Sequence, residues 1–421
     1  MAHFSAMEAS QELPDSLWRA IVPRLFADLR RQQHRMARLL GRFVRAESPS
    51  FDKAAVDRFG RMVASEWRKR GARVEFLRQR NRGDHVRGKL AFGHGPRPPR
   101  GRRFKGQILV LGHLDTVYGL GTLARMPFRI LRGRAWGPGA FDMKSGLVIA
   151  LFAVDALRRA GIAPRRRLVF LWTSDEEIGS GTSRKWIISE ARRSDAALVL
   201  EPASGAKGRL KTARKGVGEI ELTVTGRAAH AGVNPQDGVN AVHELAMQIA
   251  RIAELNDPRR GITVNVDVVE GGTRTNVIAD RARALVDVRV NRALDMRRLE
   301  ARFRALRPIL PGARLAVRGG FNRPPMERKS CAALFRRAQA LGGVMGLQLE
   351  ESFTGGGSDG NFTAALGVPT LDGLGGVGEG AHSPHENVLV RSLPERAALL
   401  AGLLAALQTE TLRRTKANQR R

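Results

Sequence analysis

The sequence predicts an α/β protein in which a mixed, mostly parallel sheet, with helices on both faces, is interrupted by an inserted ferredoxin-like βαββαβ domain. Two observations predict this arrangement. Short apolar runs alternate with helical stretches on both sides of the middle of the chain, which is typical of buried strands joined by crossover helices. In the middle, strands that alternate between apolar and polar residues accompany two helical stretches in the βαββαβ order. We therefore expect a larger domain made of residues 1–213 and 322–421, and an inserted domain at residues 214–321.

The elements follow from hydrophobic periodicity and from Gly- and Pro-rich breaks. The first part of the larger domain is expected to contain helices at 17–45, 53–70 and 143–158, strands at 74–77, 86–92, 107–111, 168–173 and 196–200, and a loop at 93–106. The inserted domain is expected to contain strands at 219–226, 262–271, 281–290 and 313–318 and helices at 240–255 and 294–309. The last part is expected to contain helices at 330–341 and 393–406 and a Gly-rich loop at 355–360.

The composition is that of a globular protein, with 43% hydrophobic and 27% charged residues. No apolar run reaches the roughly 18 residues of a membrane helix, and residues 1–16 lack the apolar core of a signal peptide. The single cysteine, Cys331, excludes an internal disulfide. Its apolar, helical surroundings indicate a buried side chain, and we expect a cytoplasmic protein.

The net charge of +32 raises the question of nucleic-acid binding. The arginines are spread along the chain, and aromatic residues make up only 5% of it, so no basic stripe with interleaved aromatics is present. We therefore expect an Arg-rich solvated surface. A field that attracts anionic substrates is the next interpretation.

Five residues that can bind metal stand in distinctive contexts: His113, Asp142, Glu177, Glu201 and His382. Three of them come at or just after an apolar strand, and the other two lie in or next to glycine-rich segments. Imidazole and carboxylate in this proportion suit zinc or a similar ion. Five such ligands are too many for one tetrahedral ion, and they suit two ions that share a bridging carboxylate.

Each context taken alone also fits a structural role. Asp142 precedes a helix and could be a plain N-cap. The run Ser174-Asp175-Glu176-Glu177 could be a charged loop, although adjacent carboxylates after a buried strand repel one another unless cations or solvent offset them. Asp115, two residues after His113, could orient that imidazole or simply cap a turn. His385 competes with His382 as a ligand.

These motifs resemble the zinc metallopeptidases and amidohydrolases of the M20 family, and most closely the glutamate carboxypeptidases of the carboxypeptidase G type. The resemblance covers the chain from about residue 30. It rests on four motifs: His113-Leu114-Asp115, the Gly-rich segment Gly137 to Lys144 with Asp142-Met143-Lys144, Glu176-Glu177, and Glu201-Pro202.

The resemblance implies a role for each site residue. His113 and Glu201 would hold one zinc, Glu177 and His382 the other, and Asp142 would bridge the two. Co²⁺ and Mn²⁺ are alternative ions. Glu176 would be the general base, Asp115 would orient His113, and the bond Asp142-Met143 is often cis in this family.

The inserted domain serves as lid and dimerisation domain in this family, so a homodimer is expected. His230, in Arg227-Ala228-Ala229-His230-Ala231-Gly232, would stabilise the oxyanion in the partner subunit's site. The resemblance implies that the substrate is held by these residues: Asn276, Arg289, Arg323, Gly356 and Gly357.

The activity expected is hydrolysis of the amide bond to a C-terminal amino acid with a free α-carboxylate, with glutamate as the favoured residue. The alternative within the family is an N-acyl-amino-acid deacylase, either an aminoacylase or a biosynthetic deacylase. A serine hydrolase is a rival, because Gly356 to Gly360 fits the Gly-x-Ser-x-Gly pattern around Ser358 and is followed by Asp372 and His382. A non-catalytic binding protein and a basic nucleic-acid binder are two further alternatives.

Overall fold

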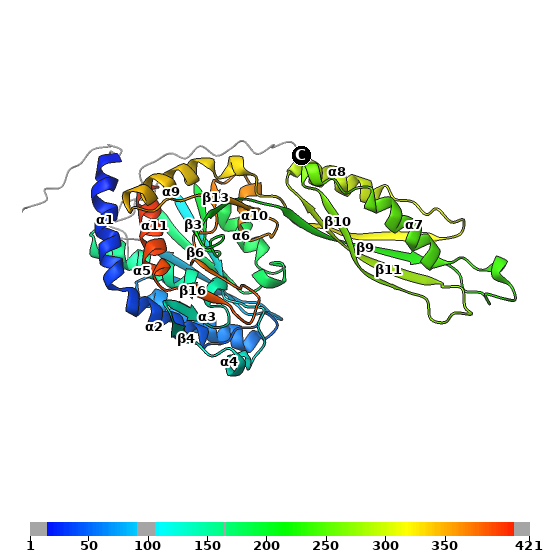
Figure 1. Ribbon diagram of the computed structural model, residues 1–421, viewed down its shortest axis with the longest axis horizontal. Helices are drawn as coiled ribbons and strands as arrows, with labels where there is room; N and C mark the ends of the chain where they lie inside the picture. Colours follow the sequence, from blue (N-terminus) through cyan, green and yellow to red (C-terminus); the bar gives the residue numbers. More distant parts are fainter. Residues whose placement is uncertain (1–14, 91–105, 163–165, 408–421) are drawn as a thin grey trace, which may run out of the picture. The chain divides into compact units, whose positions relative to one another are not determined.

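The computed structural model describes residues 15–90, 106–162 and 166–407 and divides into two compact units (Figure 1). The described residues within Met1–Lys211, Cys331–Ser352 and Leu366–Arg421 form the first unit, and Thr212–Ser330 with Phe353–Ala365 form the second. Residues 353–365, which include the Gly-rich loop, thus pack with the second unit. The sequence analysis had placed them in the larger domain, because a return of the chain to the second unit over 13 residues leaves no periodic signal.

A six-stranded sheet in the order β1-β2-β6-β3-β7-β14 organises the first unit. Its strands are β1 (Arg73–Leu77), β2 (His85–Leu90), β3 (Gln107–His113), β6 (Arg167–Thr173), β7 (Ala196–Val199) and β14 (Thr370–Leu371). The pairs β6-β3, β3-β7 and β7-β14 are parallel, while β1-β2 and β2-β6 are antiparallel. All seven residues of β3 are buried, as expected for a continuous apolar run at the centre of such a sheet.

The helices of the first unit are α1 (Asp15–Arg31), α2 (Gln33–Val44), α3 (Lys53–Lys69), α4 (Thr122–Arg125), α5 (Ser145–Arg159), α6 (Arg184–Ala191), α9 (Ala332–Val344) and α11 (Ser392–Ala406). The prediction of a single helix at 17–45 is wrong, because the helix is interrupted at Gln32 and divides into α1 and α2. The break lets apolar residues on both helices, such as Leu29 and Leu40, enter the same hydrophobic core.

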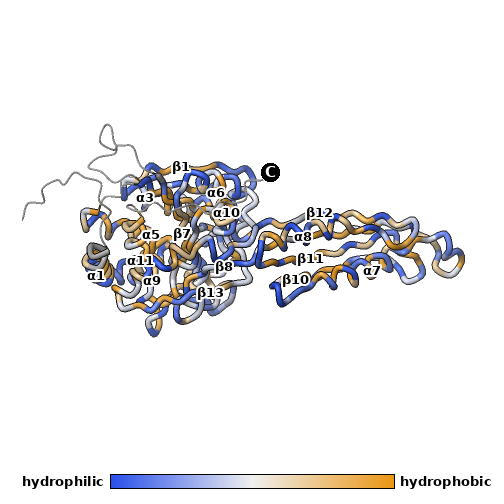
Figure 2. Tube along the Cα trace, turned by 90° about the horizontal axis from the view of Figure 1, so that it is seen from above, coloured by the Kyte–Doolittle hydropathy of each residue, from blue (hydrophilic) through white to orange (hydrophobic). Residues whose placement is uncertain are grey.

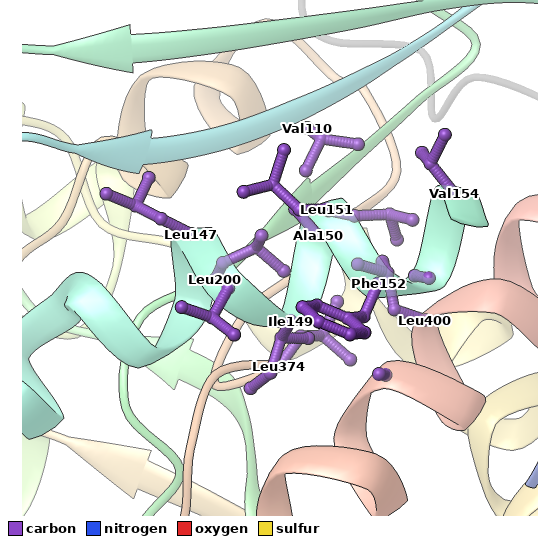
Figure 3. Close-up of a cluster of buried hydrophobic side chains, with 14 of the residues drawn as sticks. Val110, Leu147, Ile149, Ala150, Leu151, Phe152, Val154, Leu200, Leu374 and Leu400 are labelled. Carbon is purple, nitrogen blue, oxygen red and sulfur yellow. The ribbon is translucent and has the colours of Figure 1, made fainter. Parts of the chain in front are cut away.

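Helix α5 is the central element of this core. Twelve of its fifteen residues are buried, so it has no solvent-facing stripe and packs on more than one side. Figure 3 shows Val110 of β3 near one side of α5, and Leu374, which follows β14, together with Leu400 of α11 near another. The hydropathy colouring of Figure 2 shows apolar segments gathered around α5 and α11. The N-terminus of α5 is therefore held firmly, and the segment that carries Asp142 leads directly into it.

A second, four-stranded sheet was not expected from the sequence. It has the order β15-β16-β5-β4 and consists of β4 (Arg129–Leu131), β5 (Arg134–Trp136), β15 (Gly378–Glu379) and β16 (Asn387–Leu389). These strands have only two or three residues, too few to show a period. Their pairing joins segments about 250 residues apart, with Asn387 opposite Trp136. As a result, the glycine-rich segment after β5 lies beside the segment 380–386.

The second unit contains a four-stranded antiparallel sheet in the order β10-β11-β9-β12. Its elements are β9 (Gly216–Thr225), α7 (Ala241–Ala253), β10 (Thr263–Gly271), β11 (Arg281–Val290), α8 (Ala293–Arg304), β12 (Arg314–Arg323) and α10 (Gly360–Ala365). Both α7 and α8 contact the sheet and share one apolar core with it, which includes Leu222, Leu245, Val286 and Phe303. The order along the chain from β9 to β12 is βαββαβ. A two-stranded sheet pairs β8 (Leu210–Arg214) with β13 (Glu351–Thr354).

None of the helices in the described part of the chain combines the length and the apolarity of a membrane span.

Candidate metal centre and its surroundings

Three neighbouring strands of the large sheet deliver polar residues to the same edge. His113 is the last residue of β3, Glu176 and Glu177 follow β6, and Glu201 follows β7. Because β3 is parallel to both β6 and β7, their carboxyl ends meet there, which is where open α/β sheets bind ligands.

Two other segments complete the cluster. Asp142 lies in the irregular turn Ala140–Lys144 before α5, and its peptide bond to Met143 is cis, as the resemblance implied. Gly139 in this segment has φ +70°, and a Cβ there would lie 2.7 Å from Thr116, so the turn requires glycine. His382 has φ +61°, an uncommon conformation for a residue other than glycine. The small sheet brings this residue to Asp142.

The ligand atoms form two groups that share Asp142. In the first group, Nε2 of His113 lies 3.3 Å from Oδ1 of Asp142 and 3.4 Å from Oε1 of Glu201. In the second, Nε2 of His382 lies 3.5 Å from Oδ2 of Asp142 and 3.0 Å from Oε2 of Glu177. Within each group all ligand atoms lie within 4.8 Å of one another. The structure thus brings together all five residues that the sequence singled out.

These spacings fit metal ions. Ligand atoms about 2.1 Å from a tetrahedral ion lie about 3.4 Å apart, close to the separations here. Asp142 offers one oxygen to each group, as a bridging carboxylate must. In addition, the buried Oε1 of Glu177 has no hydrogen-bond partner in the described structure, which is costly unless a cation satisfies it. The donor set of two imidazoles and three carboxylates is one that zinc accepts.

The electrostatics of the cluster also call for cations. Burial tends to lower the pKa of His113, but its hydrogen bonds to Asp115, Asp142 and Glu201 raise it well above the usual value. Asp142 and Glu177 raise the pKa of His382 to about 10. Burial raises the pKa of Glu177 to about 7. The carboxylates therefore stabilise positive charge on the imidazoles, and metal ions would supply that charge in place of protons.

Asp115 was expected to orient the ring of His113, and the structure shows that it does more than this. The nearest acceptor for Nδ1 of His113 is the backbone oxygen of Asp115, at 2.9 Å, while the carboxylate oxygen is 3.5 Å away. The carboxylate accepts hydrogen bonds from the hydroxyl of Ser50 and from the backbone N–H groups of Glu176 and Glu177. Asp115 therefore positions both the imidazole and the loop with the two glutamates.

Glu386 and Tyr118 are residues that the sequence analysis missed. The buried carboxylate of Glu386 accepts hydrogen bonds from the backbone N–H groups of Gly139, Phe141 and Asp142 and from the hydroxyl of Tyr118 at 2.5 Å. Burial raises the pKa of Glu386 to about 7. The only signal in the sequence was its place four residues after His382. His385, the other candidate ligand there, is exposed and lies outside both groups of ligand atoms.

The remaining predicted residues belong to the second unit. His230 is exposed, and its Nδ1 accepts hydrogen bonds from the N–H groups of Gly232 and Val233. In a neutral imidazole the proton must then reside on Nε2, which leaves a donor free to act. The backbone oxygen of Asn276 accepts a hydrogen bond from Ala231, so these two segments lie together.

Arg289 and Arg323 are partly engaged within the second unit. Arg289 donates from Nε and Nη2 to Asp287 and from Nη1 to the backbone oxygen of Gly355. A guanidinium has five N–H groups, so two remain, one on each terminal nitrogen. Nη2 of Arg323 lies 3.4 Å from Oδ1 of Asp359. The loop glycines Gly356 and Gly357 both accept hydrogen bonds from Arg214 through their backbone oxygens.

Comparison with known proteins agrees with this geometry. Residues 109–406 match the peptidase family M20/M25/M40, and the chain belongs to this family. It is 30% identical to carboxypeptidase G2 of Pseudomonas sp. (strain RS-16) over 91% of this chain and 92% of that protein. It is 29% identical to succinyl-diaminopimelate desuccinylase of Dechloromonas aromatica over 71% of this chain and 82% of that protein. The solved aminopeptidase PepT of Bacillus cereus has the same fold, with a TM-score of 0.70 and 21% identity over 89% of this chain and 98% of that structure. The protein is thus a metal-dependent hydrolase of the metallopeptidase and amidohydrolase class.

Proposed function

We propose that this protein is a di-zinc hydrolase that cleaves the amide bond to a C-terminal amino acid with a free α-carboxylate, preferably glutamate. The observation that carries the proposal is the pair of ligand groups joined by Asp142. The similarity to carboxypeptidase G2 over nearly the whole chain supports the glutamate preference. The alternative is deacylation of another N-acyl amino acid, which the similarity to a desuccinylase supports.

Metal ions held by the five ligands would act as Lewis acids on the scissile carbonyl and on the attacking water. Glu176 is the general base in this proposal. It lies at the same strand end as the ligands and is buried, with its backbone N–H bonded to Asp115. It takes a proton from the water and returns it to the leaving amine. Asp115 serves by holding the glutamate loop and the ring of His113.

Residues of the second unit bind the substrate and stabilise the transition state. The two remaining N–H groups of Arg289 can bind the α-carboxylate, and Asn276 adds an amide donor. The Nε2–H of His230 donates to the developing oxyanion. Arg323, Gly356 and Gly357 are assigned to the substrate side chain and the loop around it.

We also propose that the protein is a cytoplasmic homodimer joined through the second unit, with His230 serving the partner subunit's site. The edge strand β10 supports this, since it carries Val268 and Val269 with 41% and 56% of their surface exposed. An unpaired edge with exposed β-branched residues is suited to association. Light scattering should give twice the monomer mass of 46.1 kDa. If the protein is a monomer and fully active, both the proposed dimer and the proposed role of His230 in the partner subunit's site are ruled out.

The serine-hydrolase alternative has less support. Ser358 is fully buried, where a nucleophile could not reach substrate, and its Oγ accepts a hydrogen bond from the N–H of Gly360. His382, the required base, directs Nε2 at Glu177 and Asp142.

The test is release of free amino acid from a panel of N-acyl and folyl substrates by zinc-loaded protein, with and without a chelator. Release that the chelator abolishes and that is strongest for C-terminal glutamate supports the full proposal. Chelator-sensitive release of other amino acids keeps the mechanism and rejects the glutamate preference. Absence of release from every substrate, with two zinc ions bound, would favour a non-catalytic binding protein.

A further inference from the structure

The first unit contains a cavity of about 390 Å³ that none of the metal-ligand groups lines. It lies between the loop after Glu201, the segment before β13 and the start of α11. Its apolar wall includes Leu347, Leu349, Val377 and Leu389. This volume is within the range of pockets that bind small organic molecules.

A buried cation lies in the wall of this cavity. Arg396 of α11 is only 3% exposed. Its Nη2 donates to the backbone oxygen of Gly208, but its Nη1 is buried without any acceptor. Among the described residues no carboxylate forms an ion pair with it. The neighbouring Glu395 affects its pKa only by a longer-range electrostatic interaction. Burial lowers the pKa of Arg396 to about 10.

Such an arrangement is costly for the protein alone. Buried arginines are almost always paired with an acid, because desolvation of an uncompensated charge is expensive. A guanidinium in the wall of a cavity, with no ion pair to a described carboxylate, is therefore suited to an anion that enters from solvent. Its planar fork matches the two oxygens of a carboxylate or phosphate.

The charges around the cavity favour an anion as well. Lys207 and Arg391 also line it, together with the acids Glu350 and Glu395. Glu350 is already neutralised, since Lys207 and Arg209 each lie 2.8 Å from it. Burial raises the pKa of Glu395, while Arg391, Arg396 and Arg30 act to lower it. The cations thus exceed the acids, and the local field is positive.

We propose that this cavity is a second binding site, which takes a small organic anion. A phosphate or carboxylate group of the ligand pairs with Arg396, Arg391 stands at the exposed side, and the body of the ligand packs on the leucines and Val377. The site is separate from the metal centre and does not depend on the proposed reaction.

The experiment is calorimetric titration of the full-length, zinc-loaded protein with inorganic phosphate and, separately, with succinate, at constant ionic strength. Two variants probe the site: Arg396→Met removes the buried charge, and Arg391→Glu reverses an exposed one. The matched control is Arg336→Gln, an exposed arginine of α9 outside the cavity. We expect saturable binding by the unchanged protein, its loss in Arg396→Met, a weakening of about tenfold or more in Arg391→Glu, and no change in the control.

The two probes distinguish the ligand chemistry, since binding of phosphate alone or of succinate alone identifies the group that the site prefers. Binding that persists unchanged in both site variants would locate the anion at the metal centre or on the Arg-rich surface and overturn the proposal. So would the absence of saturable binding of either probe up to about 10 mM. If Arg396→Met does not fold, the comparison of Arg391→Glu with the control decides the question.

Discussion

Replacing Glu386 should weaken both metal sites at once, because this residue holds the backbone of the segment that carries the shared ligand. Its carboxylate accepts four hydrogen bonds, from the N–H groups of Gly139, Phe141 and Asp142 and from Tyr118. In Glu386→Ala all four are lost, and three buried N–H groups have no partner. If each of these three unpaired N–H groups costs about 1–1.5 kcal/mol, the free energy of unfolding of the first unit should fall by about 4 kcal/mol.

Glu386→Gln should be milder, for a reason that the geometry supplies. The amide oxygen can replace Oε1, which accepts from Phe141 and Asp142. The amide NH₂ then takes the place of Oε2 and cannot accept the hydrogen bonds from Tyr118 and Gly139. The hydroxyl of Tyr118 can still donate to the backbone oxygen of Ser383, 3.1 Å away, but the backbone N–H of Gly139 cannot turn to another acceptor. One orphaned buried donor costs about 1–3 kcal/mol.

The assay is the number of zinc ions bound per chain, measured by atomic emission after dialysis against a graded series of zinc concentrations, with urea unfolding in parallel. Glu386→Ala should lose both ions over the same range, whereas His113→Ala should lose mainly one and His382→Ala mainly the other. Two ions bound as tightly as in the unchanged protein, together with an unchanged urea midpoint, would refute the reasoning. Tyr118→Phe is the control, since it removes one of the four hydrogen bonds and leaves no N–H unpaired.

Three further predictions test other parts of the molecule. Glu176→Ala should lower kcat by about 10²–10⁴ while both zinc ions remain bound, and turnover that survives would remove Glu176 as the general base. Arg289→Met should lower kcat/KM by about 10- to 100-fold, mostly through KM, and amidated substrates should be insensitive to the change. Asp84 has its pKa lowered: burial opposes the shift, but hydrogen bonds from Gln79, Lys53 and Arg78 prevail. Its stabilising effect is therefore present above its unfolded pKa and lost as the pH falls through the folded one, so Asp84→Asn should be destabilising at pH 7, and the loss of stability should shrink as the pH falls through the folded pKa.

The strands and helices that could be predicted were those with a long period or a continuous apolar run. Strand β11 was predicted at its observed bounds, Arg281–Val290, because its alternation extends over ten residues. The four short strands of the small sheet were missed, since two or three residues show no period and gain their stability from pairing across the fold. Glu386 was missed for a similar reason, because its four hydrogen-bond partners lie 244 to 268 residues away in the chain.

The sequence by itself determined the kinds of ligand and their local settings, because a metal site needs particular side chains and strand ends that present them. His113 and Glu201 could be recognised in this way without any distance. Only the tertiary structure decided that these side chains meet in two groups around Asp142, and that Asp115 and Glu386 hold the surrounding backbone. It also placed Arg396 in a cavity wall, where no carboxylate of the described residues forms an ion pair with it. Proximity and burial depend on how distant segments pack, and neither leaves a periodic trace in the chain.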